Sequence, residues 1–173
     1  MRIPPSGSFT TKYQGLSGVL LTDISINDPT INRYKGLAQS SLYAKKAIWD
    51  TGATASAITP KVAADLNLQA IGQVTVNTAN GPTITNVYVV DILLPNNIWI
   101  SDVRVTEAPI VGADALIGMD IILLGDFAVT NQNNKTTFSF IMPSIKEIDY
   151  VQQVKSKQKQ PFQPPVKGRG RRI

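Results

Sequence analysis

The residues best suited to chemistry lie in one short segment, Trp49-Asp50-Thr51-Gly52-Ala53-Thr54, directly after the apolar, β-prone run from Tyr43 to Trp49. A second signal lies about 65 residues later, where two branched apolar residues precede a glycine in Leu116-Ile117-Gly118. Asp-Thr-Gly by itself is an ordinary turn tripeptide, so each signal alone is weak. The chain has one Asp-Thr-Gly and no Asp-Ser-Gly.

The absence of two residue types narrows the chemistry. The chain has no cysteine and no histidine. This composition excludes disulfides, thiol nucleophiles, Cys-based zinc sites and the Ser-His-Asp and Cys-His mechanisms, and it removes the commonest transition-metal ligand. Any catalysis must therefore use carboxylates, hydroxyls, lysines or the backbone, and we expect no metal and no cofactor.

Length and hydropathy indicate an ordinary globular domain. The chain has 173 residues, of which 43% are hydrophobic, enough for one domain with a substantial core. The start, Met1-Arg2-Ile3-Pro4-Pro5, has no apolar h-region typical of a signal peptide, and no apolar run approaches the roughly 20 residues that span a bilayer. We expect a cytoplasmic protein without a membrane partner.

The charge is concentrated at one end of the chain. Residues 151–173 carry seven basic side chains and no acid, whereas residues 1–150 carry ten basic and twelve acidic side chains. The sequence predicts a flexible lead-in over residues 1–15, a domain over 16–148 and a basic, disordered tail over 149–173. Such a tail can bind nucleic acid or another anionic surface, be a self-cleavage site, or direct localisation, and the sequence does not decide among these roles.

The pattern between these ends favours many short strands. Thr59 and Pro60 form a good helix start, with an expected end at Asn67. Asn80-Gly81-Pro82 lies between alternating apolar runs, which is a strong hairpin signal. Further strands are expected at Leu16–Ile26, Ile98–Val105, Phe127–Thr130 and Thr136–Ile141, with a short helix at Ile121–Leu124 and a loop over residues 30–42. This pattern predicts a small, mostly-β barrel or sandwich.

Taken together, the two signals resemble the retropepsin-like aspartic protease family over roughly residues 40–142. Bacterial retropepsin-like proteins are the most similar in pattern, through Gly118-Met119-Asp120-Ile121-Ile122 and Leu124-Gly125-Asp126-Phe127. The resemblance implies a mostly-β fold, a small closed barrel with one or two short helices, which forms a two-fold homodimer.

The family mechanism would make Asp50 the catalytic residue. Two neighbouring carboxylates share a proton and hold one water; one accepts a proton from that water as it attacks the scissile carbonyl, and the other donates to the carbonyl oxygen. The two-lobed pepsin-like proteins carry two motifs in a chain about twice this long. This chain carries one, so the resemblance implies an Asp50 dyad across a homodimer.

The resemblance also assigns supporting roles. Thr51 would hydrogen-bond to the facing loop, Gly52 would allow close approach, Ala53 would leave room for substrate, and Ser56 repeats the family's hydroxyl. The remaining assignments are a support beneath the loop (Leu116, Ile117, Gly118), a flap tip (Asn80, Gly81, Pro82) and a substrate pocket (Ala53, Ile58, Val76, Ile84, Ile117).

Two other carboxylates in the same chain are candidate partners for Asp50. Asp120 and Asp126 are better interpreted as a helix anchor and a turn residue. The chain departs from the viral enzymes at Thr54, where an acidic residue is usual, at the glycine-poor flap tip, and in its first 40 residues, which have no viral counterpart.

The sequence thus predicts an aspartic endopeptidase acting on protein or peptide substrates. One alternative is a catalytically silent dimer that serves as a peptide-binding or assembly module. Another is a nucleic-acid-associated protein that uses the basic tail.

Overall fold

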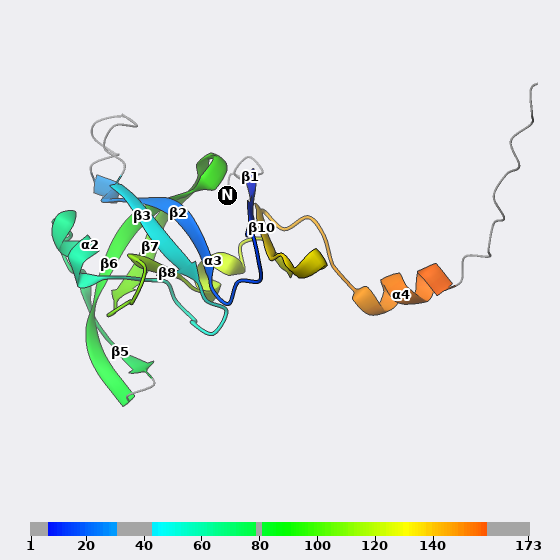
Figure 1. The fold of residues 1–173 in the computed structure, drawn as a ribbon. Helices are drawn as coiled ribbons and strands as arrows, with labels where there is room; N and C mark the ends of the chain where they lie inside the picture. The colour runs from blue at the N-terminus through cyan, green and yellow to red at the C-terminus, as the bar shows by residue number, and fades with distance from the viewer. Residues whose placement is uncertain (1–6, 31–42, 79–80, 159–173) are drawn as a thin grey trace, which may run out of the picture.

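Two β-sheets dominate the computed structural model, which describes residues 7–30, 43–78 and 81–158 (Figure 1). The larger sheet has seven strands and the smaller has three. None of the helices in the described ranges is long and apolar enough to cross a membrane.

The larger sheet closes on itself as a barrel. Its strands run in the order β2-β3-β8-β4-β7-β6-β5, and a further pairing of β2 with β6 closes the ring. Apolar side chains alternate along these strands and fill the interior, as Val103 and Val105 do. The strand bounds are β2 Leu20–Asn27, β3 Tyr43–Trp49, β4 Ala57–Ile58, β5 Gly72–Thr78, β6 Gly81–Leu94, β7 Ile98–Glu107 and β8 Ala115–Ile117.

Short helices connect the strands. In α2 (Pro60–Asp65), the Thr59 side chain accepts a hydrogen bond from the Val62 N–H at 3.3 Å, which confirms the predicted helix start. The other helical segments are α3 (Met119–Ile122), α4 (Tyr150–Gln158) and the 3-10 turns η2 (Pro95–Asn97) and η3 (Gln132–Asn134).

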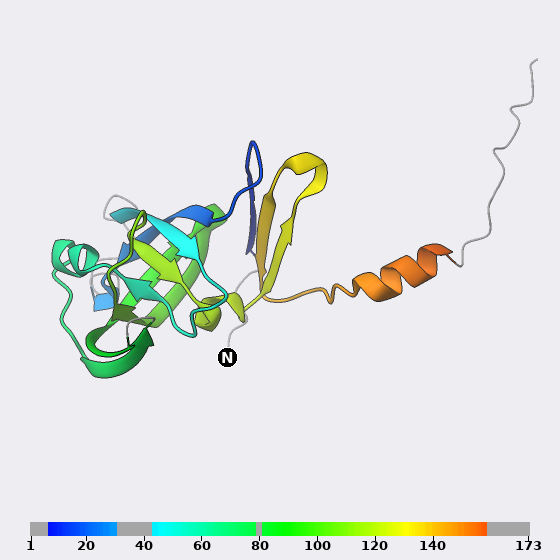
Figure 2. The ribbon, with the colours of Figure 1, turned by 60° about the horizontal axis from the view of Figure 1, so that its bottom comes forward.

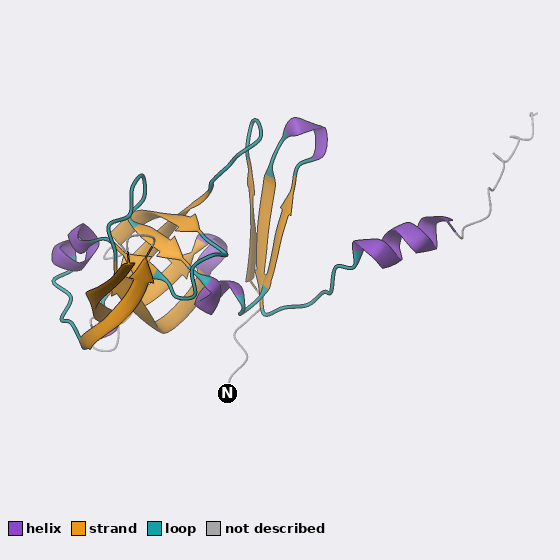
Figure 3. Ribbon diagram, turned by 90° about the horizontal axis from the view of Figure 1, so that it is seen from below, coloured by secondary structure: helices purple, strands orange, loops and turns teal. Residues whose placement is uncertain are grey.

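The smaller sheet joins the two ends of the domain. Its order is β1 (Gly7–Lys12), β10 (Thr137–Met142) and β9 (Asp126–Thr130), all antiparallel. It stands beside the barrel, and the chain leaves it towards α4, which projects away from both sheets (Figure 2). The same two strand layers appear from below in Figure 3.

An aromatic cluster fixes the smaller sheet to the barrel. Trp49 of β3 packs against Phe138 and Phe140 of β10, with ring centroids 5.1 Å apart in both pairs. Phe9 of β1 and Phe127 of β9 complete the cluster. Because Trp49 directly precedes Asp50, the smaller sheet buttresses the strand that carries the candidate catalytic residue.

Several sequence expectations need correction. Residues 1–15 are not simply a lead-in, because β1 pairs with β10 over six residues and belongs to the domain. Within the predicted disordered tail, Tyr150–Gln158 forms α4, whose first turn Asp149 caps through a hydrogen bond to the Gln152 N–H. The tail beyond residue 158, the loop at 31–42 and Asn80 of the flap tip lie outside the described residues.

Other predicted element bounds also shift, including the end of the first helix, which lies at Asp65 rather than Asn67. The strand expected from Leu16 begins at Leu20, and the helix expected from Ile121 begins at Met119. The helix starts early because the loop after Asp50 accepts hydrogen bonds from the N–H groups of Met119 and Asp120.

Candidate active site

Asp50 lies at the end of β3, on a loop that continues to Ser56. Its side chain is partly exposed, and its Oδ1 accepts a hydrogen bond from the Gly52 N–H at 2.8 Å. Its own N–H donates to the Ile117 carbonyl at 2.9 Å. The carboxylate is therefore held at a fixed position at the surface, where a water or a substrate can reach it.

The Leu-Ile-Gly signal lies beneath this loop, as the resemblance implied. Strand β8 pairs in parallel with β3 and antiparallel with β4, so it runs between the strands that enter and leave the loop. A Cβ on Gly118 would lie 2.6 Å from the Ala55 carbonyl carbon and 2.7 Å from its oxygen. Only glycine fits without displacing the loop that carries Asp50.

The loop also caps α3. The N–H groups of Met119 and Asp120 donate to the carbonyls of Ala53 and Thr54, at 2.8 and 3.2 Å. The first N–H groups of a helix have no hydrogen-bond acceptor within the helix. The residue before α3 is Gly118, which has no side chain that could accept from them. The loop carbonyls therefore satisfy the hydrogen-bonding needs of the first N–H groups of α3, and these N–H groups hold the loop in place.

Ser56 and Asp120 form a second link. The Asp120 carboxylate accepts from the Ser56 hydroxyl at 2.7 Å and from the Ser56 N–H at 3.0 Å. The Ser56 Oγ in turn accepts from the Gly118 N–H at 3.1 Å, and Ser56 is fully buried. Asp120 thus anchors both the helix and the loop; its contact with Ser56 has no signal in the sequence.

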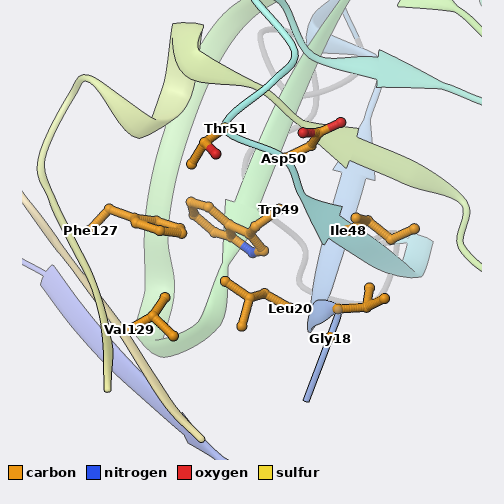
Figure 4. A pocket seen from close by; sticks show the side chains of 9 residues that line it. Gly18, Leu20, Ile48, Trp49, Asp50, Thr51, Phe127 and Val129 are labelled. Carbon is orange, nitrogen blue, oxygen red and sulfur yellow. The ribbon is translucent and has the colours of Figure 1, made fainter. Parts of the chain in front are cut away.

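A cavity of about 430 Å³ opens beside Asp50 (Figure 4). Asp50 and Thr51 lie on one side of it, and Leu20 and Val129 lie opposite, with the Trp49 and Phe127 rings between them. The sequence predicts the strand Phe127–Thr130 but not that its residues Phe127 and Val129 line a cavity with Asp50, because nothing in these residues marks that contact.

The predicted pocket residues separate into two groups. Val76 and Ile84 line one cavity of about 420 Å³ at the β5–β6 hairpin, together with Pro60 and Glu107. Ile58 and Ile117 are fully buried in the core, so a role in lining a pocket was wrong for both.

The described part of the predicted flap tip consists of Gly81 and Pro82, at the start of β6. Gly81 has φ 105°, a conformation that glycine adopts readily, and pairs with Thr78 across the hairpin. Pro82 is exposed and pairs with Asn77. The hairpin expected here is therefore present.

A polar group lies at the base of this hairpin. The Tyr88 hydroxyl donates to the Glu107 carboxylate at 2.7 Å, and the Thr85 hydroxyl donates to the Glu107 carbonyl at 2.6 Å. Burial, and then the hydrogen bond to Glu107, raise the pKa of Tyr88 above its ordinary value of 10.0. Tyr88 therefore stays protonated and links β6 to the end of β7.

No cluster of three acidic side chains that could hold a metal ion occurs within residues 7–30, 43–78 and 81–158. The two other candidate partner carboxylates, Asp120 and Asp126, have structural partners. Asp120 holds Ser56, and Asp126 accepts hydrogen bonds from the Ser144 hydroxyl and from the N–H groups of Ile145 and Lys146. Asp126 is thus a turn residue, as the sequence indicated.

Comparison with known proteins confirms the resemblance. Residues 42–121, which include Asp50 and Gly118, match the family model described as Aspartyl protease. The fold is similar to that of a retropepsin-like aspartic protease from Rickettsia conorii, with a TM-score of 0.50, 14% identity, and coverage of 80% of this chain and 96% of that one. The chain therefore has a retropepsin-like, mostly-β fold.

Two further structures match more distantly. The Simian Foamy Virus (mac) protease gives a TM-score of 0.40 at 18% identity, over 60% of this chain and 91% of that one. The retroviral protease-like domain of Ddi1 from Leishmania major gives 0.41 at 16% identity, over 71% and 95%. No curated protein matches the chain.

Proposed function

We propose that this protein is an aspartic endopeptidase that hydrolyses peptide bonds with a water activated by two copies of Asp50. The observation that carries the proposal is the fixed position of Asp50: a partly exposed carboxylate on a loop held from beneath by Ile117, Gly118 and Asp120. Catalytic carboxylates need such preorganisation, because reacting groups must stay within a fraction of an ångström of the productive geometry.

In the proposed reaction the two carboxylates share one proton and hold the water between them. The ionised carboxylate takes a proton from the water as its oxygen attacks the scissile carbonyl carbon, and the protonated one donates to the carbonyl oxygen. Collapse of the tetrahedral intermediate breaks the C–N bond, and the leaving amine receives a proton from the dyad. Water is consumed and no cofactor takes part.

The second carboxylate must come from a second copy of the chain. The sequence contains one Asp-Thr-Gly, and the other two carboxylates that were considered, Asp120 and Asp126, already have structural partners. A two-fold homodimer would place Asp50 against Asp50, with Thr51 and Gly52 supporting each carboxylate.

The substrate would bind as an extended peptide between this loop and the β5–β6 hairpin, paired as an added strand. Val76 and Ile84 would contact its side chains, since both line the cavity at the hairpin. Closure of the hairpin tip, including Gly81 and Pro82, would exclude water from the site.

The decisive experiment compares the wild type with Asp50→Asn on a diverse peptide library, from acidic to neutral pH. We expect pepstatin-sensitive cleavage by the wild type and a loss of about 10²- to 10⁴-fold in the variant. Asp23→Asn is the matched control, because Asp23 is exposed on β2 and pairs only with Lys46 among the described residues. Equal cleavage by wild type and Asp50→Asn would refute the role of Asp50.

A dimeric protein that binds peptides but cleaves none would instead support a non-catalytic peptide-binding or assembly module. Nucleic-acid binding that disappears on truncation after Tyr150 would assign that activity to the basic tail. The cytoplasmic location stays a prediction.

A further inference from the structure

The helix α4 lacks the packing that a short helix normally has. Isolated helices shorter than about 12–15 residues are marginal in water, and most helices in proteins are stabilised by the packing of one apolar face. α4 has nine residues and projects away from both sheets (Figure 1 and Figure 2). Each of its side chains from Tyr150 to Ser156 is exposed. A surface that covers one face of α4 would therefore stabilise it.

The hydrogen bonds of α4 do not reach the sheets. The Gln152 N–H donates to the Asp149 carboxylate at 3.0 Å, and the Gln153 N–H donates to the Asp149 carbonyl at 3.1 Å. The Ser156 hydroxyl donates to the Gln153 carbonyl at 3.0 Å. Among the described residues, no hydrogen bond joins α4 to either sheet. The domain itself therefore supplies no cover for the helix.

The apolar residues of α4 share one face. Tyr150, Val151 and Val154 fall within an arc of about 100° at 3.6 residues per turn. Their exposed fractions are 62%, 62% and 54%. Gln152 and Ser156 lie on the opposite side of the helix at the same periodicity. The helix thus presents an uncovered apolar face with a polar face behind it.

Basic residues accompany this face. Lys155 follows Val151 by one turn and lies at the border of the apolar arc. Among the described residues, no acid forms an ion pair with Lys155. Asp149 is the last acid in the chain, and residues 151–173 carry seven basic side chains. A partner that complements α4 must therefore be anionic and must also cover apolar side chains.

An anionic bilayer meets both conditions. Its headgroups attract lysine and arginine, and the boundary between headgroups and acyl chains covers the apolar face of a helix that lies in the surface plane. A nucleic acid attracts lysine through its phosphates, and this attraction needs no apolar helix face. The combination of an apolar arc with basic residues therefore favours the bilayer.

We propose that α4 binds the surface of an anionic phospholipid bilayer, with Tyr150, Val151 and Val154 inserted at the level of the headgroups. Lys155 and the basic residues that follow it would contact the charged headgroups. The expectation of no membrane partner rested on the lack of a spanning segment and of a signal peptide, and surface binding requires neither. The inference does not depend on the proposed peptidase activity.

The connection to the domain is short. The N–H groups of Ile145 and Lys146 both donate to the Asp126 carboxylate at 2.9 Å, which fixes this point of the chain to β9. Only residues 147–149 separate Lys146 from the start of α4. Three residues span at most about 11 Å when extended. Binding of α4 would therefore keep the whole domain close to the lipid surface.

Vesicle flotation with the full-length protein tests the lipid preference. We compare vesicles of phosphatidylcholine alone with vesicles of phosphatidylcholine and phosphatidylserine at about 7:3. We expect at least about tenfold tighter binding to the anionic vesicles, since each lysine or arginine near such a surface contributes about fivefold. Equal affinity for the two compositions, or no binding to either, would overturn the proposal.

A double variant, Val151→Gln with Val154→Gln, tests the apolar face at unchanged charge. Glutamine has a higher helix propensity than valine, so a loss of binding would not come from a weaker helix. We expect affinity for the anionic vesicles to fall by at least about fivefold. Leu16→Gln is the control, because it removes a 66% exposed apolar side chain far from α4 in the sequence. Equal affinity of the double variant and the wild type would refute insertion of this face.

A fluorescent reporter tests the orientation, because the chain has no cysteine of its own. Val154→Cys and Gln152→Cys each place one environment-sensitive dye, on the apolar and on the polar face. We expect a blue shift with anionic vesicles for Val154→Cys and little shift for Gln152→Cys. Equal shifts, or a shift with duplex DNA and none with vesicles, would overturn the proposal.

Two further measurements separate this inference from the rest. Urea midpoints equal to that of the wild type establish that the variants are folded, since α4 lies outside both sheets. Asp50→Asn should bind anionic vesicles as the wild type does. Vesicle binding by a protein that cleaves no peptide would leave the lipid surface standing and refute the peptidase, and peptide cleavage without vesicle binding would do the reverse.

Discussion

The Asp120 carboxylate holds Ser56 with two hydrogen bonds, from its hydroxyl at 2.7 Å and from its N–H at 3.0 Å. This contact joins the first residues of α3 to the end of the loop that begins at Asp50. Its geometry turns two segments more than 60 residues apart in sequence into one rigid support.

Asp120→Asn tests this support. An amide replaces one carboxylate oxygen with an N–H donor, so one of the two Ser56 donors faces another donor in a partly buried contact. We expect the free energy of unfolding to fall by about 1–3 kcal/mol. Urea denaturation measures this change, and Glu147→Gln, which changes an exposed carboxylate, should leave the midpoint unchanged. Equal stability of Asp120→Asn and wild type would show that the pair does not hold the loop.

Gly118→Ala tests the close approach beneath the loop. The added methyl group would meet the Ala55 backbone at 2.6 Å, so the loop that carries Asp50 must move. We expect a loss of about 1–3 kcal/mol in thermal or urea unfolding, and a fall in any Asp50-dependent peptide cleavage. Gly15→Ala is the control, because no atom lies within 4 Å of a Cβ there. If both variants behaved alike, the packing argument would fail.

Phe138→Ala tests the attachment of the smaller sheet to the barrel. Phe138 is fully buried and contacts Trp49, Phe9 and Phe127. We expect a loss of about 3–5 kcal/mol, since a large cavity forms in the aromatic cluster. In a Trp99→Phe background, the fluorescence of Trp49 should shift to the red as water reaches the ring. An unshifted spectrum would contradict the role of the cluster in burying Trp49.

Asp126→Asn tests a pH-dependent contact. Hydrogen bonds from the Ser144 hydroxyl and from the Ile145 and Lys146 N–H groups hold the pKa of Asp126 below its ordinary value of 3.8. A lowered pKa in the folded state gives stability that is present above the unfolded-state pKa and is lost as the pH falls through the folded-state pKa.

We therefore expect the wild type to be more stable than Asp126→Asn at neutral pH, and the difference to shrink below about pH 4. Urea midpoints at several pH values measure it. A difference that stayed constant down to about pH 2 would rule out the carboxylate as its source.

The sequence indicated the Asp50 loop and the Gly118 segment that lies beneath it, because both depend on local residue types. Asp50 follows an apolar run and marks the end of a strand. Gly118 follows two branched apolar residues and marks a position where two backbone segments approach closely. Thr59 before Pro60 marked a helix start for the same reason: a side-chain cap acts within three residues.

The sequence failed where the outcome depended on distant contacts. Gly7–Lys12 is short and polar, and it is a strand because β10 pairs with it more than 120 residues away. Ile58 was expected in a pocket because it is apolar and near the motif, but burial is set by the layers that cover it. The helix at Tyr150–Gln158 was not predicted, because the composition of this segment is typical of disorder.

By itself, the sequence determined the available chemistry. A chain without histidine and cysteine leaves carboxylates, hydroxyls, lysines and the backbone for catalysis, and its one Asp-Thr-Gly supplies one candidate catalytic carboxylate. The tertiary structure alone decided what surrounds that carboxylate: the link between Asp120 and Ser56, the aromatic cluster behind Trp49, and the two β9 residues that line the cavity, Phe127 and Val129. The physical reason is that residue type fixes the chemistry of a side chain, whereas its neighbours depend on strand pairing and packing across the whole chain.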